Sequence, residues 1–161
     1  MAERGHRFYG TTRVRVTKTV NAPLRYVYDW STDYRSDDGT LSSRRPRPRF
    51  RVLRLSKHRV LRVRTTPNGT PDPDVAVDVV RLDPPSRWHT DQIDETDRES
   101  VDYRLASVGR RTTRLTLLVT ERWLTPDHPT PAELAERLSR GWDRYIAAIE
   151  ARYRAGRPAK G

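Results

Sequence analysis

The sequence predicts an α+β fold in which a curved antiparallel sheet of seven strands wraps around one long C-terminal helix. Two observations support this prediction. A helical pattern runs over Thr130–Ala155, and strand-like runs recur about every ten residues over Phe50–Trp123. Because consecutive strands with short turns pair as an antiparallel meander, one sheet packed against one helix follows.

The C-terminal helix has the clearest start and end signals in the chain. Thr130 can cap it, Pro131 suits the first helical position, and Glu133 completes a capping box. Gly156 and Pro158 end it. Apolar residues recur at spacings of three and four, which predicts one buried stripe: Leu134, Leu138, Trp142, Tyr145, Ile146, Ile149 and Tyr153.

The strands are predicted from alternation and from turn residues. The first, Thr11–Val20, alternates valine with arginine and threonine. Asn21-Ala22-Pro23 then predicts a cap and a short helix that carries Leu24, Val27, Tyr28 and Trp30, followed by one more helical turn around Thr32–Arg35. The meander strands are Arg49–Ser56, Arg59–Thr66, Asp74–Leu82, Arg87–Ile93, Ser100–Ser107 and Thr112–Trp123.

Several residues depart from these patterns. The adjacent apolar pairs Val52-Leu53 and Val79-Val80 break the alternation and predict bulges. Lys18 has the parity of the valines, so it either snorkels from the strand end or meets a charge inside. Gly141 costs about 1 kcal/mol of helix stability relative to alanine. It either permits a close approach by another element or a ligand, or is tolerated on a solvated face.

Composition limits the class of protein. The 161 residues predict one domain over 1–161, with residues 1–10 and 156–161 as flexible ends. The absence of cysteine excludes disulfides, thiolate metal sites and cysteine nucleophiles. No apolar segment is long enough for a signal peptide or a membrane span, so a soluble cytoplasmic protein is expected.

The net charge of +11 comes from 32 basic residues, of which 29 are arginine. One hypothesis is a basic outer sheet face that binds RNA or an anionic membrane. The arginines interpreted as outward are Arg13, Arg15, Arg49, Arg51, Arg62, Arg64, Arg104 and Arg114. Arginines occur in every element and no exposed aromatic row accompanies them, so nucleic acid is not the expected partner. The basic segment Ser42–Arg49 is interpreted as a solvated loop.

The order of elements resembles the helix-grip superfamily, also called SRPBCC. This superfamily includes START lipid-transfer domains, polyketide cyclases and dehydratases, and pollen-allergen-like ligand binders. The matching stretches are VTKTVNAPLRYVYDW, LDPPSRW and GWDRYIAAIEARY. The resemblance implies a mostly apolar cavity between the concave sheet face and the long helix. It also implies binding or transport of a lipid, polyketide or aromatic compound, or, as an alternative, cyclase or dehydratase activity.

Candidate site residues follow from this resemblance and from strand parity. Expected to line the cavity are Trp30, Tyr34, Trp88, Tyr103, Leu117, Val119, Trp142, Tyr145 and Ile149, with ordinary core packing as the alternative for each. Candidates for proton transfer are the polar residues within strands, namely His89, Asp78, Asp91 and Glu121. Glu121 has the inward parity of Leu117 and Val119.

The histidines are too far apart in the sequence to form a metal-binding motif, so no metal is expected. No phosphate-binding glycine loop or nucleophile elbow is present, and no cofactor is expected. Whether the chain is an enzyme, which ligand it binds and its oligomeric state stay open at this point.

Overall fold

The computed structural model describes residues 8–35 and 46–160. Parts of the expected flexible start 1–10 and of the basic loop Ser42–Arg49, together with residue 161, therefore lie outside the description. The elements are β1 (Gly10–Val20), α1 (Leu24–Ser31), β2 (Arg49–Ser56), β3 (Arg59–Thr66), β4 (Asp74–Asp83), β5 (Arg87–Ile93), β6 (Asp97–Gly109), β7 (Thr112–Trp123) and α2 (Pro131–Arg154).

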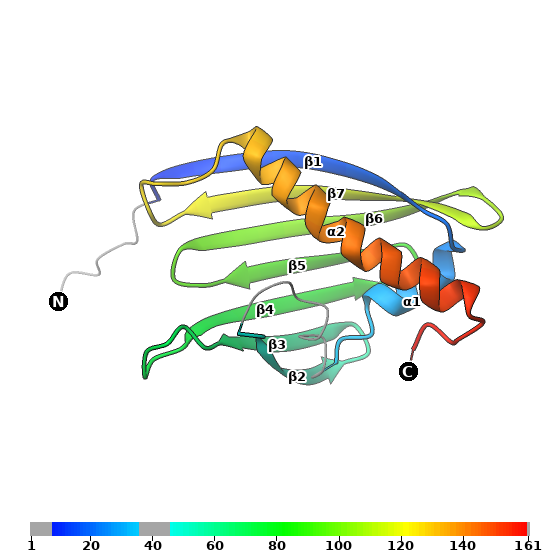
Figure 1. Ribbon diagram of the computed structural model, residues 1–161, viewed down its shortest axis with the longest axis horizontal. Coiled ribbons are helices and arrows are strands. Elements are labelled where there is room, and N and C mark those ends of the chain that lie inside the picture. Colours follow the sequence, from blue (N-terminus) through cyan, green and yellow to red (C-terminus); the bar gives the residue numbers. More distant parts are fainter. Residues whose placement is uncertain (1–7, 36–45, 161) are drawn as a thin grey trace.

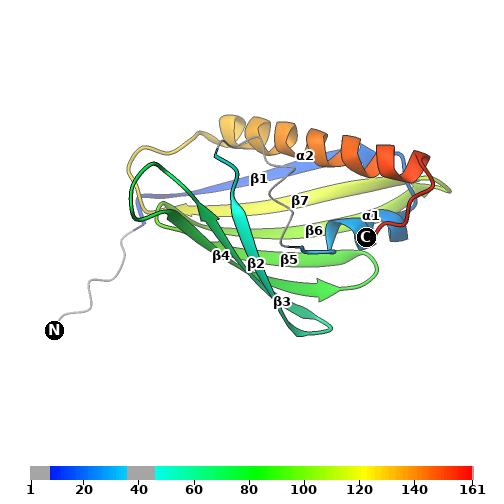
Figure 2. The same cartoon turned by 60° about the horizontal axis from the view of Figure 1, so that its bottom comes forward.

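The seven strands form one antiparallel sheet in the order β1-β7-β6-β5-β4-β3-β2. α2 crosses one face of this sheet diagonally, and α1 lies beside its C-terminal half (Figure 1). Figure 2 shows that β2 and β3 are turned away from the direction of β1 and β7, so the sheet curves. The predicted α+β architecture is confirmed.

α2 begins and ends as its sequence predicts. The Thr130 side chain accepts a hydrogen bond from the Glu133 backbone N–H, and the Glu133 carboxylate accepts one from the Thr130 N–H at 2.8 Å. Gly156 has a φ of +66°, which favours glycine directly after the helix. α1 differs, because its N-cap is Pro23 with no side-chain cap, so the predicted cap at Asn21 is wrong. No helical turn continues over Thr32–Arg35.

The core lies between α2, α1 and the nearer strands. α2 packs mainly against β1, and α1 contacts β6 and β7, which leaves the β3 side of the concave surface uncovered by helix. Burial of each aliphatic side chain contributes about 1.5–3 kcal/mol. The buried cluster comprises Val16, Val20, Ala22, Val27, Tyr28, Val60, Val80, Trp88, Val101, Leu105, Leu115, Leu117, Val119, Ile146 and Ile149. At its edge, Lys18 Nζ lies 2.7 Å from Asp143 Oδ1 on α2, so this lysine meets a charge.

The predicted bulges are wrong. The ladder continues through Val52-Leu53 and through Val79-Val80, and the register shifts elsewhere, between Arg54 and Ser56 and between Ser107 and Gly109. The reason is that β2, β3 and β4 carry apolar side chains on both faces. Leu53, Leu61 and Val79 are partners in register on the outer face, so no strand has to bulge to bury them.

The outward placement of Arg62 and Arg64 is also wrong. Val60 is fully buried, and both arginines share its parity on β3 and line the concave side. Arg62 tolerates this position because its register partner on β4 is Asp78, which pairs with it. The basic outer face therefore has fewer arginines than the sequence indicated. No helix in the described part of the chain is long and apolar enough to cross a membrane.

Candidate functional site

A cavity of about 800 Å³ opens between the concave side of β3 to β6, the end of α1 and the second half of α2. The cavity exists because α2 leaves the sheet uncovered on the β3 side. Much of its wall is aromatic, and these rings come from both helices, from three strands and from the segment after α1: Trp30, Tyr34, Phe50, Trp88, Tyr103, Trp142 and Tyr145.

The rings form a continuous series. Trp88 and Tyr103 are register partners on β5 and β6, and their rings stack with centroids 4.6 Å apart. Tyr103 then contacts Trp142 at 5.7 Å, and Trp142 contacts Tyr145 at 5.4 Å. Burial raises the pKa of Tyr103 well above its usual value, so its phenol stays protonated at neutral pH. These rings offer a planar, apolar contact surface to a ligand.

One cross-strand row on the concave face is polar over its whole length. Its members are partners in register on six neighbouring strands, from β3 to β1: Arg62, Asp78, Gln92, Glu99, Glu121 and Thr12. The adjacent row is almost entirely apolar and contains Val60, Val80, Thr90, Val101, Val119 and Val14. The polar row therefore forms a sharp boundary with the apolar half of the concave face.

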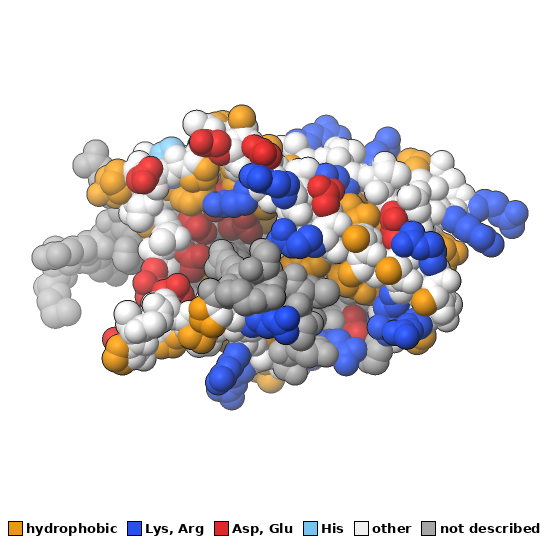
Figure 3. Space-filling model, in the orientation of Figure 1, with side chains coloured by type: hydrophobic (Ala, Val, Ile, Leu, Met, Phe, Trp, Pro, Cys, Tyr) orange, Lys and Arg blue, Asp and Glu red, His pale blue; other side chains and the backbone are white. Residues whose placement is uncertain are grey.

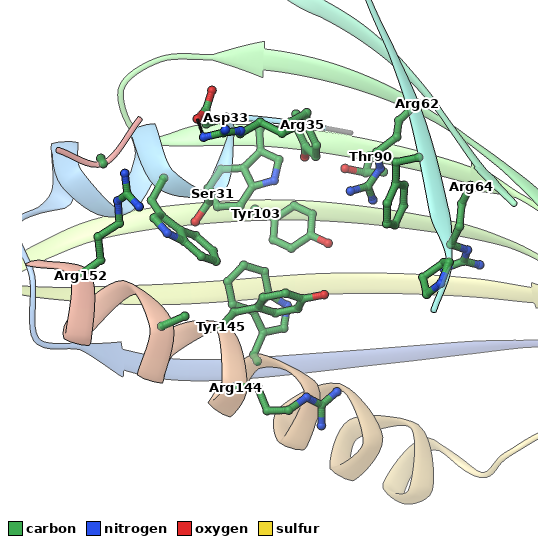
Figure 4. A pocket seen from close by; sticks show the side chains of 18 of the residues that line it. Ser31, Asp33, Arg35, Arg62, Arg64, Thr90, Tyr103, Arg144, Tyr145 and Arg152 are labelled. Carbon is green, nitrogen blue, oxygen red and sulfur yellow. Dashed lines mark ion pairs between the residues drawn. The ribbon is translucent and has the colours of Figure 1, made fainter. Parts of the chain in front are cut away.

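Arg62 is held from several sides. Its Nε lies 2.7 Å from Oδ2 of Asp78, whose side chain is almost fully buried. The guanidinium carbon lies 5.0 Å from the centre of the Tyr34 ring and 4.7 Å from that of Phe50, distances at which a cation and an aromatic face attract. In Figure 4, Arg62 and Arg64 extend from β3 on the side of the cavity opposite α2. The geometry fixes a positive charge in the cavity wall.

Glu99 and Glu121 face each other across β6 and β7, and Asp97 lies on the same side. Burial, reinforced by the neighbouring Asp97 charge, raises the pKa of Glu99 to about 7. Burial and the Glu99 charge raise that of Glu121 to about 8, although Arg137 lies 3.3 Å away. Figure 3 shows acidic side chains in the hollow below the first half of α2. Of these acids, Glu99 lines the cavity.

The structure brings six of the nine predicted lining residues to the cavity wall. These are Trp30, Tyr34, Trp88, Tyr103, Trp142 and Tyr145. Leu117, Val119 and Ile149 also face inward, but they are fully buried in the core and do not line the cavity. The difference arises because α2 lies over the β1 and β7 side of the sheet and leaves the cavity on the β3 side.

The four candidates for proton transfer divide between the two faces. His89 and Asp91 lie on the outer face, where His89 Nε2 is 3.0 Å from Asp91 Oδ1 and 3.1 Å from Ser100 Oγ. Both contacts use the same imidazole nitrogen, so this group lacks the relay geometry of a catalytic triad. Asp78 and Glu121 face inward, but their carboxylates are paired with Arg62 and Arg137.

Sequence reasoning missed the charged residues nearest the cavity. Glu99 has the parity of Val101 and Tyr103, but it was placed in a turn because the strand was predicted to start at Ser100. A start at Asp97 would have identified it. Arg62 could have been identified from the parity of Val60, had Leu61 not suggested the opposite face.

No protein-family model and no curated protein sequence matches the chain. Among solved structures, the chain is similar to the Zhui aromatase/cyclase from Streptomyces sp. R1128 at 17% identity and a TM-score of 0.55, with 88% of this chain and 93% of that chain covered. It is similar to Ara h 8.0201 at 13% identity and a TM-score of 0.63, covering 88% and 97%. The chain has the helix-grip fold.

A START superfamily protein from Mycobacterium smegmatis shares this helix-grip fold at 13% identity and a TM-score of 0.58, covering 89% of this chain and 97% of that chain. At such identities the likeness concerns the fold, and function has to be argued from the cavity itself. Within the described residues, no group of three or more histidine, aspartate or glutamate side chains could hold a metal ion.

Proposed function

We propose that the chain binds a hydrophobic, aromatic small molecule in the cavity between its sheet and α2. The supporting observation is the series of aromatic rings around about 800 Å³ of free space. A cavity of this size is typical of small-molecule sites, which are lined mainly by apolar side chains with a few polar groups. The solved structures of similar fold include an aromatase/cyclase and a START superfamily protein, which agrees with this class of ligand.

A cavity-filling substitution tests the proposal with a matched control. Ala148 on α2 lines the cavity, whereas its neighbour Ala147 is exposed. Ala148→Phe is expected to abolish binding of the neutral fluorescent probe N-phenyl-1-naphthylamine, and Ala147→Phe is expected to leave it unchanged. Equal binding by both variants, or no binding by the unmodified protein, would contradict the proposal. Native mass spectrometry of the purified protein would identify any ligand retained from the cell.

A second candidate function is proton transfer on the bound molecule, as in a cyclase or dehydratase. The observation that favours it is Glu99, a carboxyl in the cavity wall with a pKa of about 7, close to the pH at which general acids and bases work best. Arg62 lines the same cavity and can stabilise negative charge that develops on a carbonyl oxygen. In this reaction Glu99 removes the proton next to a carbonyl and later returns it.

Deuterium exchange tests this second function. The protein in heavy water is expected to accelerate exchange of the α-protons of 2-tetralone, followed by proton NMR. Glu99→Gln keeps the shape of the side chain but cannot accept the proton, so exchange is expected to fall to the buffer rate while probe binding persists. Exchange that is unchanged in Glu99→Gln would exclude this residue as the base.

A further inference from the structure

The arginines of α2 differ in their partners according to the face on which they lie. Arg137, Arg140 and Arg154 do not line the cavity, and they pair with Glu121, Glu136 and Glu150. Arg144 and Arg152 line the cavity, and neither has an acidic partner in residues 8–35 and 46–160. The outer arginines of α2 thus have acidic partners on the helix itself or on β7, and the two at the cavity have none among the described residues.

The charges around the cavity are unbalanced. Of the arginines that line it, Arg62 pairs with Asp78, Arg64 lies 4.0 Å from Asp94, and Arg35 lies 4.0 Å from Asp33. The remaining three, Arg144, Arg152 and Arg157, have no acidic partner in residues 8–35 and 46–160 and supply the excess positive charge. Because the pKa of Glu99 is raised to about 7, this acid carries only part of a negative charge at neutral pH. An anion inside the cavity would therefore meet a net positive potential, and low-dielectric walls strengthen that potential.

The helix surface between the two arginines carries small side chains toward the cavity. Arg144 and Arg152 are eight residues apart, about 12 Å along the helix axis, and Ala148 lies between them. Ala148, Ala151, Ala155 and Ala159 line this side of the cavity, so no large side chain fills it. Figure 4 shows both arginines extending from α2, with Tyr145 from the same helix beside the cavity. Because only alanine stands between them on this face, both long side chains can turn toward a small acidic group over Ala148.

The helix dipole does not account for this arrangement. Arg152 lies in the last turn of α2, where a cation also offsets the negative end of the helix, and its Nε donates to the Pro158 carbonyl. Arg144 lies more than two turns from that end, where the dipole effect has faded. A mid-helix arginine that lines a cavity and has no acidic partner among the described residues points to an anion from outside the chain.

We propose that the ligand is an aromatic organic anion whose carboxylate, sulfonate or phosphate lies between Arg144 and Arg152, with its ring system against Tyr145 and Trp142. This inference rests on the proposed ligand binding and names the chemical class of the ligand. Arginine suits such groups because its planar fork can donate two hydrogen bonds to one carboxylate or phosphate.

Two probes with the same aromatic body separate this inference from the proposed function. 1-Anilinonaphthalene-8-sulfonate carries a sulfonate, and N-phenyl-1-naphthylamine lacks it. The sulfonate probe is expected to bind about ten-fold more tightly, which corresponds to one charge-assisted hydrogen bond. Binding of neither probe would contradict the proposed function itself. Equal binding of both would leave the proposed function intact and overturn the anion inference.

Substitutions locate the anion. Arg144→Gln is expected to weaken binding of the sulfonate probe about five-fold and binding of the neutral probe less than two-fold. The control is Arg114→Gln, on the exposed outer face of β7. It removes the same charge and is expected to leave the affinities for both probes unchanged. Arg152→Gln is a second variant, used if its melting temperature equals that of the unmodified protein. An unchanged ratio of the two affinities in Arg144→Gln would overturn the assignment.

Displacement of the sulfonate probe by 2-naphthoate and by 2-naphthyl phosphate, with 2-naphthol as the neutral reference, distinguishes a carboxylate from a phosphate as the preferred acidic group.

Discussion

Replacement of Glu99 by glutamine is expected to make the protein more stable in mildly alkaline solution. The pKa of Glu99 rises from its ordinary 4.5 to about 7 in the folded chain. The folded state therefore holds this proton more tightly than the unfolded state, and stability falls as the pH rises between these two values. Full ionisation of Glu99 costs about 3 kcal/mol. Glutamine resembles the protonated acid and does not incur this cost.

The difference between the two proteins should therefore grow with pH. At pH 5 the variant gains about 1 kcal/mol or less, because Glu99 is still protonated in the folded state. At pH 9 the gain approaches about 3 kcal/mol. Glu121 has a pKa of about 8, so its ionisation also lowers the stability of the folded protein as the pH rises. Because the Glu99 charge helps to raise this pKa, Glu99→Gln lowers the pKa of Glu121 and adds to the gain in stability. The lowered pKa values of Asp91 and Asp102 act below pH 3.8, outside this window.

Urea unfolding followed by tryptophan fluorescence, repeated from pH 5 to pH 9, measures this difference. Glu136→Gln provides the control, because Glu136 is an exposed carboxylate on α2. A stability difference that stays constant across the pH range would refute the reasoning, since it would mean that Glu99 does not titrate between its ordinary pKa and 7.

Three further outcomes are expected from unfolding and probe-binding assays. Trp142→Ala should cost about 1–2 kcal/mol, less than the 3–5 typical of a fully buried ring, because Trp142 is half-buried and borders the cavity; a larger loss would indicate ordinary core packing. Gly141→Ala should stabilise the protein by up to about 1 kcal/mol, because a Cβ there meets nothing within 4 Å; a loss would reveal a contact at this helix position. Arg13→Gln with Arg15→Gln should change stability by less than about 0.5 kcal/mol and leave probe binding unchanged, because both are exposed on β1; loss of probe binding would show that the outer face takes part.

The fold was predictable because its signals are local and agree with one another. The capping box at Thr130 and Glu133 fixes the start of α2, and the bounds of β2, β3, β5 and β7 follow from alternation and turn residues. Each signal requires only neighbouring residues to be known. The antiparallel order follows because short turns join consecutive strands.

The charged part of the site was not predictable to the same degree. Whether Arg62 faces inward depends on its partner Asp78 on another strand, which strand parity alone cannot show when Leu61 and Val63 make the opposite face equally apolar. The same ambiguity led to the wrong prediction of bulges. The close-approach explanation for Gly141 fails for other described elements, because the space beside it is open. Such facts depend on side chains that only the folded sheet brings together.

The apolar and polar halves of the concave face contribute differently to stability, and this difference bears on the class of ligand proposed above. Apolar rows such as that of Val101 and Val119 stabilise the fold, whereas buried ion pairs often add no stability over apolar residues of equal volume. Arg62 and Glu99 nevertheless line the cavity at the boundary between these halves. A purely hydrocarbon ligand would remove water from both groups without replacing its hydrogen bonds, which costs binding energy. We therefore expect the proposed aromatic ligand to bind more tightly than a simple lipid chain when it carries oxygen groups that face the polar row, in addition to the acidic group near Arg144 and Arg152.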